Sequence, residues 1–181
     1  IRLRELVAQG DLGSLKYISS RRLSFGKIRS EEDVLWSFAP HDISMILKLA
    51  NQSVIDIRCE AIEIQQAKIA DQTHLHILFE SGLRGYVHCS WPHPDKEQKL
   101  IVIGSEGMAV FDDTMPWKHK LALYSHKVDW TGSSLELTKE DAIYEEVGFI
   151  EPLKNECQYF INLICGEVEP LTSGYEGREV L

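Results

Sequence analysis

The adjacent ionisable residues His41 and Asp42 are the part of this sequence best suited to chemistry. Proline lacks an N–H and is well tolerated in the first turn of a helix, so Pro40 predicts that a short helix begins just before the pair. The two side chains would then lie beside free backbone N–H groups at the positive end of that helix, where a protonated imidazole is disfavoured. The pattern therefore predicts a neutral histidine that can accept a proton. The alternative is a capping aspartate beside a histidine that only packs.

The stretch 30–50 must position this pair, and its apolar residues recur at helical spacing. Those residues are Val34, Leu35, Phe38, Met45, Ile46 and Leu49. Ser30, followed three residues later by Asp33, has the form of a helix N-cap with its reciprocal partner. Because a proline disfavours helical geometry at the residue before it, we expect two short helices separated at Pro40.

Positive charge is concentrated at Arg21 and Arg22, with Lys27 and Arg29 close behind. The 181-residue chain as a whole has a formal net charge of −9, which disfavours a nucleic acid or an anionic membrane as a partner. A local basic cluster on an acidic protein suits a small anionic ligand. The alternative is a solvated loop.

The four cysteines show neither a C-x-x-C pairing nor a spacing to histidine that suits a metal site. They are Cys59, Cys89, Cys157 and Cys165. Because each falls in a predicted strand or helix, we expect reduced core residues and a cytoplasmic protein. No apolar run approaches the roughly 20 residues that a membrane helix needs, and no stretch resembles a signal peptide, so we expect no membrane partner.

Alternating and apolar runs joined by short turns predict a series of strands. The predicted strands are 15–25, 55–61, 74–79, 85–91, 99–103, 108–111, 121–124 and 135–138. In 55–61 the alternation predicts one buried and one wet face, and the change of phase at Ile62 indicates a bulge or the end of the strand. His74 and His76 share one side of their strand without an apparent third ligand, so we expect a polar sheet face and no metal site.

A last helix is predicted from Pro152 to Cys165, with an apolar face and Gly166 as its stop. Short connections make mostly antiparallel neighbours, so the fold class is α+β: an open, mostly antiparallel sheet with helices packed on one face. The other face must be exposed or paired, which favours a homodimer or homotetramer through the sheet. Both ends of the chain look cut, so we expect a fragment of a longer protein.

Several motifs, in this order, resemble the C-terminal substrate and dimerisation domain of the Gfo/Idh/MocA oxidoreductases. They are LGSLKY at 12–17, RLSFGKIR at 22–29, EDVLWSFAPHDIS at 32–44, SWPHPDK at 90–96, VIGSEGMAVFDD at 102–113, and the closing Glu151, Pro152, Leu153, Glu156 and Phe160. Within the family the chain is most similar to the nucleotide-sugar dehydrogenases of the UDP-N-acetylglucosamine 3-dehydrogenase type.

The resemblance implies a dihydrodipicolinate reductase-like C-terminal domain over residues 11–181. It also implies that 1–10 is the tail helix of a missing Rossmann domain that carries the main binding site for NAD or NADP. The family's catalytic histidine matches His41, which would take a proton from a sugar hydroxyl. Many members carry an aspartate at the position of Ser37, which bears no charge. The substrate-binding residues that the resemblance implies are Arg22, Lys27, Arg29, Trp36 and Ser37.

Two functions from different classes remain open. The first is the substrate-binding half of an NAD(P)-dependent oxidoreductase that oxidises a hydroxyl of a sugar or UDP-sugar and is inactive without its other half. The second is a non-catalytic binding or assembly module that retains only the sheet scaffold.

Overall fold

A computed structural model describes residues 2–26, 28–131, 134–148 and 151–181. Its helices are α1 (Arg2–Gln9), α2 (Val34–Ala50), α3 (Pro152–Ile164) and α4 (Gly174–Val180), with a short 3₁₀ helix η1 (Trp117–His119). Its strands are β1 (Leu15–Leu23), β2 (Val54–Ile62), β3 (Gln72–Phe79), β4 (Arg84–Ser90), β5 (Glu97–Gly104), β6 (Met108–Asp112), β7 (Leu121–Tyr124), β8 (Lys127–Thr131), β9 (Ser134–Thr138) and β10 (Ile143–Tyr144).

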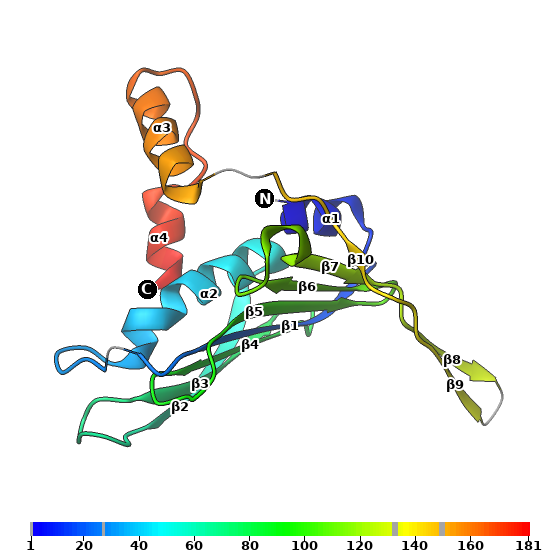
Figure 1. The fold of residues 1–181 in the computed structure, drawn as a ribbon, viewed down its shortest axis with the longest axis horizontal. Helices are drawn as coiled ribbons and strands as arrows, with labels where there is room; N and C mark the ends of the chain where they lie inside the picture. Colours follow the sequence, from blue (N-terminus) through cyan, green and yellow to red (C-terminus); the bar gives the residue numbers. More distant parts are fainter. Residues whose placement is uncertain (1, 27, 132–133, 149–150) are drawn as a thin grey trace.

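Eight strands form one open sheet in the order β10-β7-β6-β5-β1-β4-β3-β2 (Figure 1). β1 and β4 are parallel, whereas the other neighbouring pairs in this sheet are antiparallel. The four labelled α-helices lie on one side of the sheet, and the β8–β9 hairpin projects away from it. The predicted α+β class, with a mostly antiparallel open sheet and helices on one face, is therefore confirmed.

The hydrophobic core lies between α2 and the sheet face that we call the inner face. Ile18 of β1, Val87 of β4 and Val102 of β5 are buried there against Ile46 of α2. A Cβ on Gly85 would lie 2.9 Å from Ile46 Cγ2, so the glycine lets α2 approach the sheet closely. The inner face and α2 thus form a fixed framework for the side chains between them.

Helix α2 corrects two predictions about the stretch 30–50. It is one helix from Val34 to Ala50 with Pro40 in its interior, and not two helices separated there. Its N-cap is Asp33, whose carboxylate accepts a hydrogen bond from the Trp36 N–H at 3.0 Å, so Ser30 is not the cap. His41 therefore lies beyond the first turn, and the field at the helix N-terminus cannot be the reason for a neutral imidazole.

Edge strand β2 corrects a third prediction. The residues between its first and last are exposed, so neither of its faces is buried within this chain. Ile55 and Ile57 are among the exposed large apolar side chains. At Ile62 the strand ends, as one of the two alternatives predicted, and its register shift lies at the other end, between Val54 and Asp56.

Helix α3 begins at Pro152 as predicted and ends at Ile164, one residue before the predicted end, but none of its residues is buried. Of the four cysteines only Cys89 is in the core, and the other three are exposed, so the prediction of four core cysteines is wrong. Helix α4, which has a capping box made by Ser173 and Glu176, was not predicted from the sequence. Each described helix is too short or too polar to cross a lipid bilayer.

The outer face of the sheet is polar on the β2, β3 and β4 side, as predicted from His74 and His76. His74 stacks on His88 of β4 with ring centroids 4.2 Å apart. Partial burial and the neighbouring His74 lower the pKa of His88 to about 4. Apolar residues occupy the other side of this face, where Ile101 pairs with Val110 across β5 and β6.

Candidate functional site

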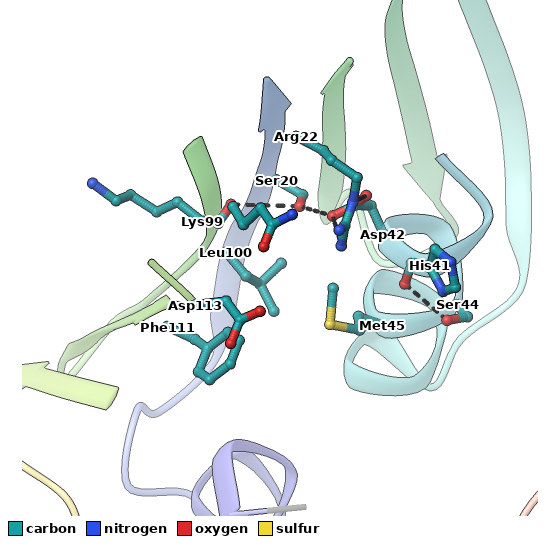
Figure 2. Close-up of a pocket in the computed structure, with 11 residues that line it drawn as sticks. Ser20, Arg22, His41, Asp42, Ser44, Met45, Lys99, Leu100, Phe111 and Asp113 are labelled. Carbon is teal, nitrogen blue, oxygen red and sulfur yellow. Dashed lines mark hydrogen bonds and ion pairs between the residues drawn. The ribbon is translucent and has the colours of Figure 1, made fainter. Parts of the chain in front are cut away.

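A pocket of about 390 Å³ opens on the inner face, between α2 and strands β1, β5 and β6 (Figure 2). Its lining residues are Ser20, Arg22, His41, Asp42, Ser44, Met45, Gln98, Lys99, Leu100, Phe111 and Asp113. Apolar side chains and ionisable groups are both represented. Such a mixture is typical of a site for a small polar ligand.

Asp42 is the centre of the polar network in this pocket, and its side chain is only 2% exposed. Its carboxylate accepts a hydrogen bond from the Ser20 hydroxyl at 2.5 Å and another from Arg22 Nε at 2.6 Å. Arg22 Nη2 lies 3.5 Å from the oxygen that Ser20 also contacts. The buried carboxylate is thus paired and hydrogen-bonded, as a charge removed from water must be.

The local structure explains why these three side chains meet. Residues two apart in a strand point to the same face, so Ser20 and Arg22 of β1 both point to the inner face. Asp42 lies on the side of α2 that carries Met45 and Ile46 towards the sheet. The ion pair between Arg22 and Asp42 therefore ties α2 to the central strand at the pocket.

His41 lines the same pocket but does not join this network. Its side chain is exposed, and its backbone carbonyl accepts a hydrogen bond from the Ser44 hydroxyl at 2.8 Å. Figure 2 shows the imidazole beside Ser44, turned away from the Asp42 carboxylate. An exposed imidazole at the edge of a pocket can exchange a proton with a ligand and with solvent.

Opposite α2, at the end of β6, lie two further aspartates, each with a lysine partner. Asp113 lines the pocket and forms an ion pair with Lys120. Asp112 is not a lining residue; its carboxylate forms an ion pair with Lys99 Nζ at 3.1 Å, on the same face of the sheet as Ile101 and Val110. Burial alone would raise the pKa of Asp112, but hydrogen bonds from Thr114 and Lys99 outweigh it and lower that pKa below its ordinary value. Both walls therefore carry charge that is largely compensated.

The compensation decides what the pocket suits. Arg22 is neutralised by Asp42, and the lysines by their aspartates, so no cation in the lining is without a carboxylate partner. The site offers donors and acceptors around the apolar side chains of Met45 and Phe111. A polyhydroxylated, uncharged ring matches this chemistry better than a bare phosphate does.

The basic residues predicted to hold a substrate do not form one cluster. Arg22 lies in the pocket, whereas Arg21 points to the outer face, where its Nη1 lies 3.4 Å from Glu97 Oε2. Arg29 pairs with Glu32 at 2.5 Å, outside the pocket lining. Lys27 lies outside the described residues.

The other two predicted binding residues, Trp36 and Ser37, are also outside the lining. Trp36 is 57% exposed near the start of α2. The polar pocket residues that were not predicted from the sequence include Ser20 and Asp113, and the pairing of Asp42 with Arg22 was not predicted either. Asp42 is not a capping residue. The sequence signal for its pairing with Arg22 is the alternation along β1, which places the Arg22 side chain on the inner face.

The described residues include no group of three or more His, Cys, Asp or Glu side chains that could hold a metal ion. Within the same part of the chain, α2 begins after the Asp33 cap and not after a glycine-rich turn that follows a strand. A dinucleotide pyrophosphate is held by a helix N-terminus of the latter kind. The residues that the structure describes therefore do not fit the main part of an NAD(P) site.

A sequence model of the GFO/IDH/MocA C-terminal domain matches residues 1–110. The chain belongs to this family. A comparison with curated proteins found no match.

Solved structures with the same fold include three oxidoreductases. UDP-N-acetylglucosamine 3-dehydrogenase GnnA from Acidithiobacillus ferrooxidans has a TM-score of 0.74 at 19% identity, over 97% of this chain and 54% of its own. The aldose-aldose oxidoreductase from Caulobacter crescentus, complexed with glycerol, has a TM-score of 0.75 at 12% identity. The match covers 98% of this chain and 53% of that protein. The WlbA dehydrogenase from Bordetella pertussis, in complex with NADH and UDP-GlcNAcA, has a TM-score of 0.69 at 13% identity. The match covers 99% of this chain and 52% of that protein. The chain spans about half the length of each.

Proposed function

We propose that this chain is the substrate-binding half of an NAD(P)-dependent oxidoreductase that oxidises a hydroxyl group of a sugar, with nucleotide sugars such as UDP-N-acetylglucosamine as the substrate class. The observation that carries the proposal is that His41 lines a polar, charge-compensated pocket together with Arg22 and Asp42. Membership of an oxidoreductase family supports this chemistry. The similar protein GnnA is a UDP-N-acetylglucosamine 3-dehydrogenase, and WlbA was solved in complex with UDP-GlcNAcA, which supports the substrate class.

Each pocket residue has a distinct role in this proposal. His41 accepts the proton of the sugar hydroxyl as that hydroxyl becomes a carbonyl. Arg22, fixed by Asp42 and Ser20, donates hydrogen bonds to the sugar. The side chains of Met45 and Phe111 contact the apolar face of the ring. NAD(P), when bound, supplies the hydride acceptor.

The nucleotide part of the substrate would lie outside the pocket, because the pocket itself has no uncompensated cation for a diphosphate. The loop that follows β1 carries Lys27 and Arg29 and is the basic segment nearest in sequence. Since Arg29 is paired with Glu32, an uncharged sugar or polyol is the second candidate substrate. Comparing UDP-N-acetylglucosamine with N-acetylglucosamine as substrates separates the two.

The proposal includes a second domain, since the fit to NAD(P) is poor here and the solved neighbours are about twice as long. Residues 1–10 would be the tail helix of a Rossmann domain, and 11–181 the substrate-binding and oligomerisation domain. Leu6 of α1 is nevertheless buried in the core of the present domain. The isolated chain is then inactive, and the cytoplasm is its expected location.

Activity can be tested in a joined protein, in which the part of WlbA outside its match to this chain is linked ahead of Ile1. We expect NADH formation from a UDP-sugar, and a loss of kcat of about 10²–10⁴-fold in His41→Asn. His76→Asn, which changes an exposed histidine on the outer face, is the matched control and should keep kcat. A His41→Asn enzyme with a kcat within threefold of the parent would contradict the role of His41.

Assembly is the remaining part of the proposal. The apolar pairs of the outer face, such as Ile101 with Val110, would be covered by a second copy in a homodimer or homotetramer. Light scattering at micromolar concentration should give at least twice the monomer mass of 20.7 kDa. A monomer at that concentration would refute assembly through the sheet.

A further inference from the structure

Asp113 is a charged residue of the pocket to which the proposed function gives no role. It follows strand β6 and lines the pocket on the side opposite α2. Its side chain is 47% exposed and forms an ion pair with Lys120, which is not a lining residue. Figure 2 shows the Asp113 carboxylate facing the gap that separates it from Met45. The carboxylate is therefore open to a ligand, whereas its counter-ion lies outside the lining.

The position of Asp113 is fixed relative to the network around Arg22. The Asp113 N–H donates a hydrogen bond to the Gln98 carbonyl at 2.8 Å, which ties the residue to β5. Gln98 pairs in register with Arg22 of β1, and both residues line the pocket. Two strand spacings, about 10 Å in all, separate Arg22 from Asp113. One sugar ring with its substituents can therefore contact both side chains.

The pocket presents more negative than positive charge to a ligand. Asp42 and Asp113 supply two carboxylates, and Arg22 supplies one guanidinium that Asp42 already neutralises. Lys99 does not change this balance, because its ammonium pairs with Asp112 on the outer face of the sheet. Among the lining residues that the structure describes, no lysine or arginine is left to receive an anionic group of a ligand.

We propose that Asp113 is a specificity-determining residue that selects an uncharged sugar ring and excludes a ring that carries a carboxylate; this inference rests on the proposed function. UDP-GlcNAcA has a carboxylate where UDP-N-acetylglucosamine has a primary alcohol. A sugar hydroxyl can donate a hydrogen bond to the Asp113 carboxylate, and a bond to a charged acceptor is strong. An ionised carboxylate has no proton to donate and is repelled by Asp113. A built-in repulsion of this kind rejects one ligand while the other still binds.

The test is a titration of the chain with each of these two nucleotide sugars, followed by the backbone amide shifts of the pocket. The parent chain should bind UDP-N-acetylglucosamine about tenfold more tightly than UDP-GlcNAcA, or better, because like charges brought together oppose binding. Asp113→Asn should reduce this ratio to about threefold or less by strengthening the binding of UDP-GlcNAcA. Asp112→Asn, which breaks the equivalent lysine pair on the outer face, is the matched control and should keep the parent ratio.

Lys120→Gln should change the ratio in the opposite direction. It removes the cation that partly compensates Asp113, so the rejection of UDP-GlcNAcA should become stronger than in the parent chain. Lys120 Nζ also lies 5.0 Å from the centroid of the Trp117 ring, so the replacement removes a packing contact as well. The melting temperature of each variant, measured in the same buffer, shows that the compared proteins are folded.

Several results would overturn the proposal and leave the proposed function standing. They are equal affinity for the two nucleotide sugars, tighter binding of UDP-GlcNAcA, an unchanged ratio in Asp113→Asn, and a smaller ratio in Lys120→Gln. If neither nucleotide sugar changes the amides of the pocket, the proposed function is refuted and this inference with it. The two failures are therefore distinguishable in one set of titrations.

Discussion

Replacing Asp42 by alanine should be among the most damaging single changes in this domain. Asp42 is 2% exposed, and its removal leaves the Arg22 guanidinium, itself 21% exposed, without its carboxylate. Breaking a buried ion pair by removing one partner costs about 3–5 kcal/mol. Ser20 loses its close acceptor too, although the Lys99 carbonyl remains 3.4 Å away.

That loss of stability can be measured by urea titration and by thermal melting of the chain. For a protein of this size each 1 kcal/mol lowers Tm by about 2–4 °C, so Asp42→Ala should lower it by about 6–20 °C. His41→Asn is the matched control in the neighbouring position. Because the His41 side chain is exposed, its replacement should change the free energy of unfolding by about 0.5 kcal/mol or less.

A double variant tests the reasoning further. Replacing both members of a buried ion pair by apolar residues of similar volume is often neutral or stabilising. Asp42→Leu combined with Arg22→Leu should therefore recover most of the stability that Asp42→Leu alone loses. An Asp42→Ala protein within 1 kcal/mol of the parent, or a double variant that is less stable than either single variant, would refute the account of this network.

Three further outcomes are expected. Because the pKa of His88 in the folded protein is about 4, below the ordinary 6.5, the neutral form is favoured by folding and stability should fall as the pH falls from about 6.5 towards 4; in His88→Gln this fall should be shallower, and an unchanged slope would contradict it. Gly104→Ala, whose Cβ would lie 1.8 Å from the Leu12 carbonyl oxygen, should lower stability by at least 1–3 kcal/mol, roughly the cost of overpacking, whereas Gly174→Ala, with no atom within 4 Å, should not. Burial raises the pKa of Cys89 far above its ordinary value, so iodoacetamide should modify this thiol only after unfolding. Rapid labelling of Cys89 in the native protein would contradict this prediction. The thiols expected to react earlier are Cys59, Cys157 and Cys165.

The sequence predicted the sheet well because its signals there are local. Alternation and short turns indicate the strands, and the short connection predicted between 74–79 and 85–91 is a turn at Gly82, with φ of +87°, that joins β3 to β4. Pro40 misled because a proline in a helix interior is costly on its own. Packing of the α2 face against the inner face of the sheet outweighs that cost, and such packing is not visible in a local pattern.

The candidate site was predictable only in part for the same reason. The pair of His41 and Asp42 was found, but their roles depend on contacts between residues about 20 positions apart, such as that of Asp42 with Arg22. The exposure of the apolar residues of α3 and β2 could not have been predicted from the sequence either. Their sequence patterns are those of elements that pack against a partner. Such a pattern shows that an element has an apolar face, but not whether this chain supplies the surface that covers it.

The most direct test of the central claim is a titration of the isotopically labelled chain with UDP-N-acetylglucosamine, followed by backbone amide chemical shifts. Binding in the pocket predicts that the largest changes occur at the amides of 20–22, 41–45, 98–100 and 111–113, which include its lining residues. NADH, added alone, should leave those amides unchanged because the chain does not fit its pyrophosphate. Changes confined to the outer face or the absence of any change with the sugar nucleotide at millimolar concentration would contradict the claim that this domain binds the sugar.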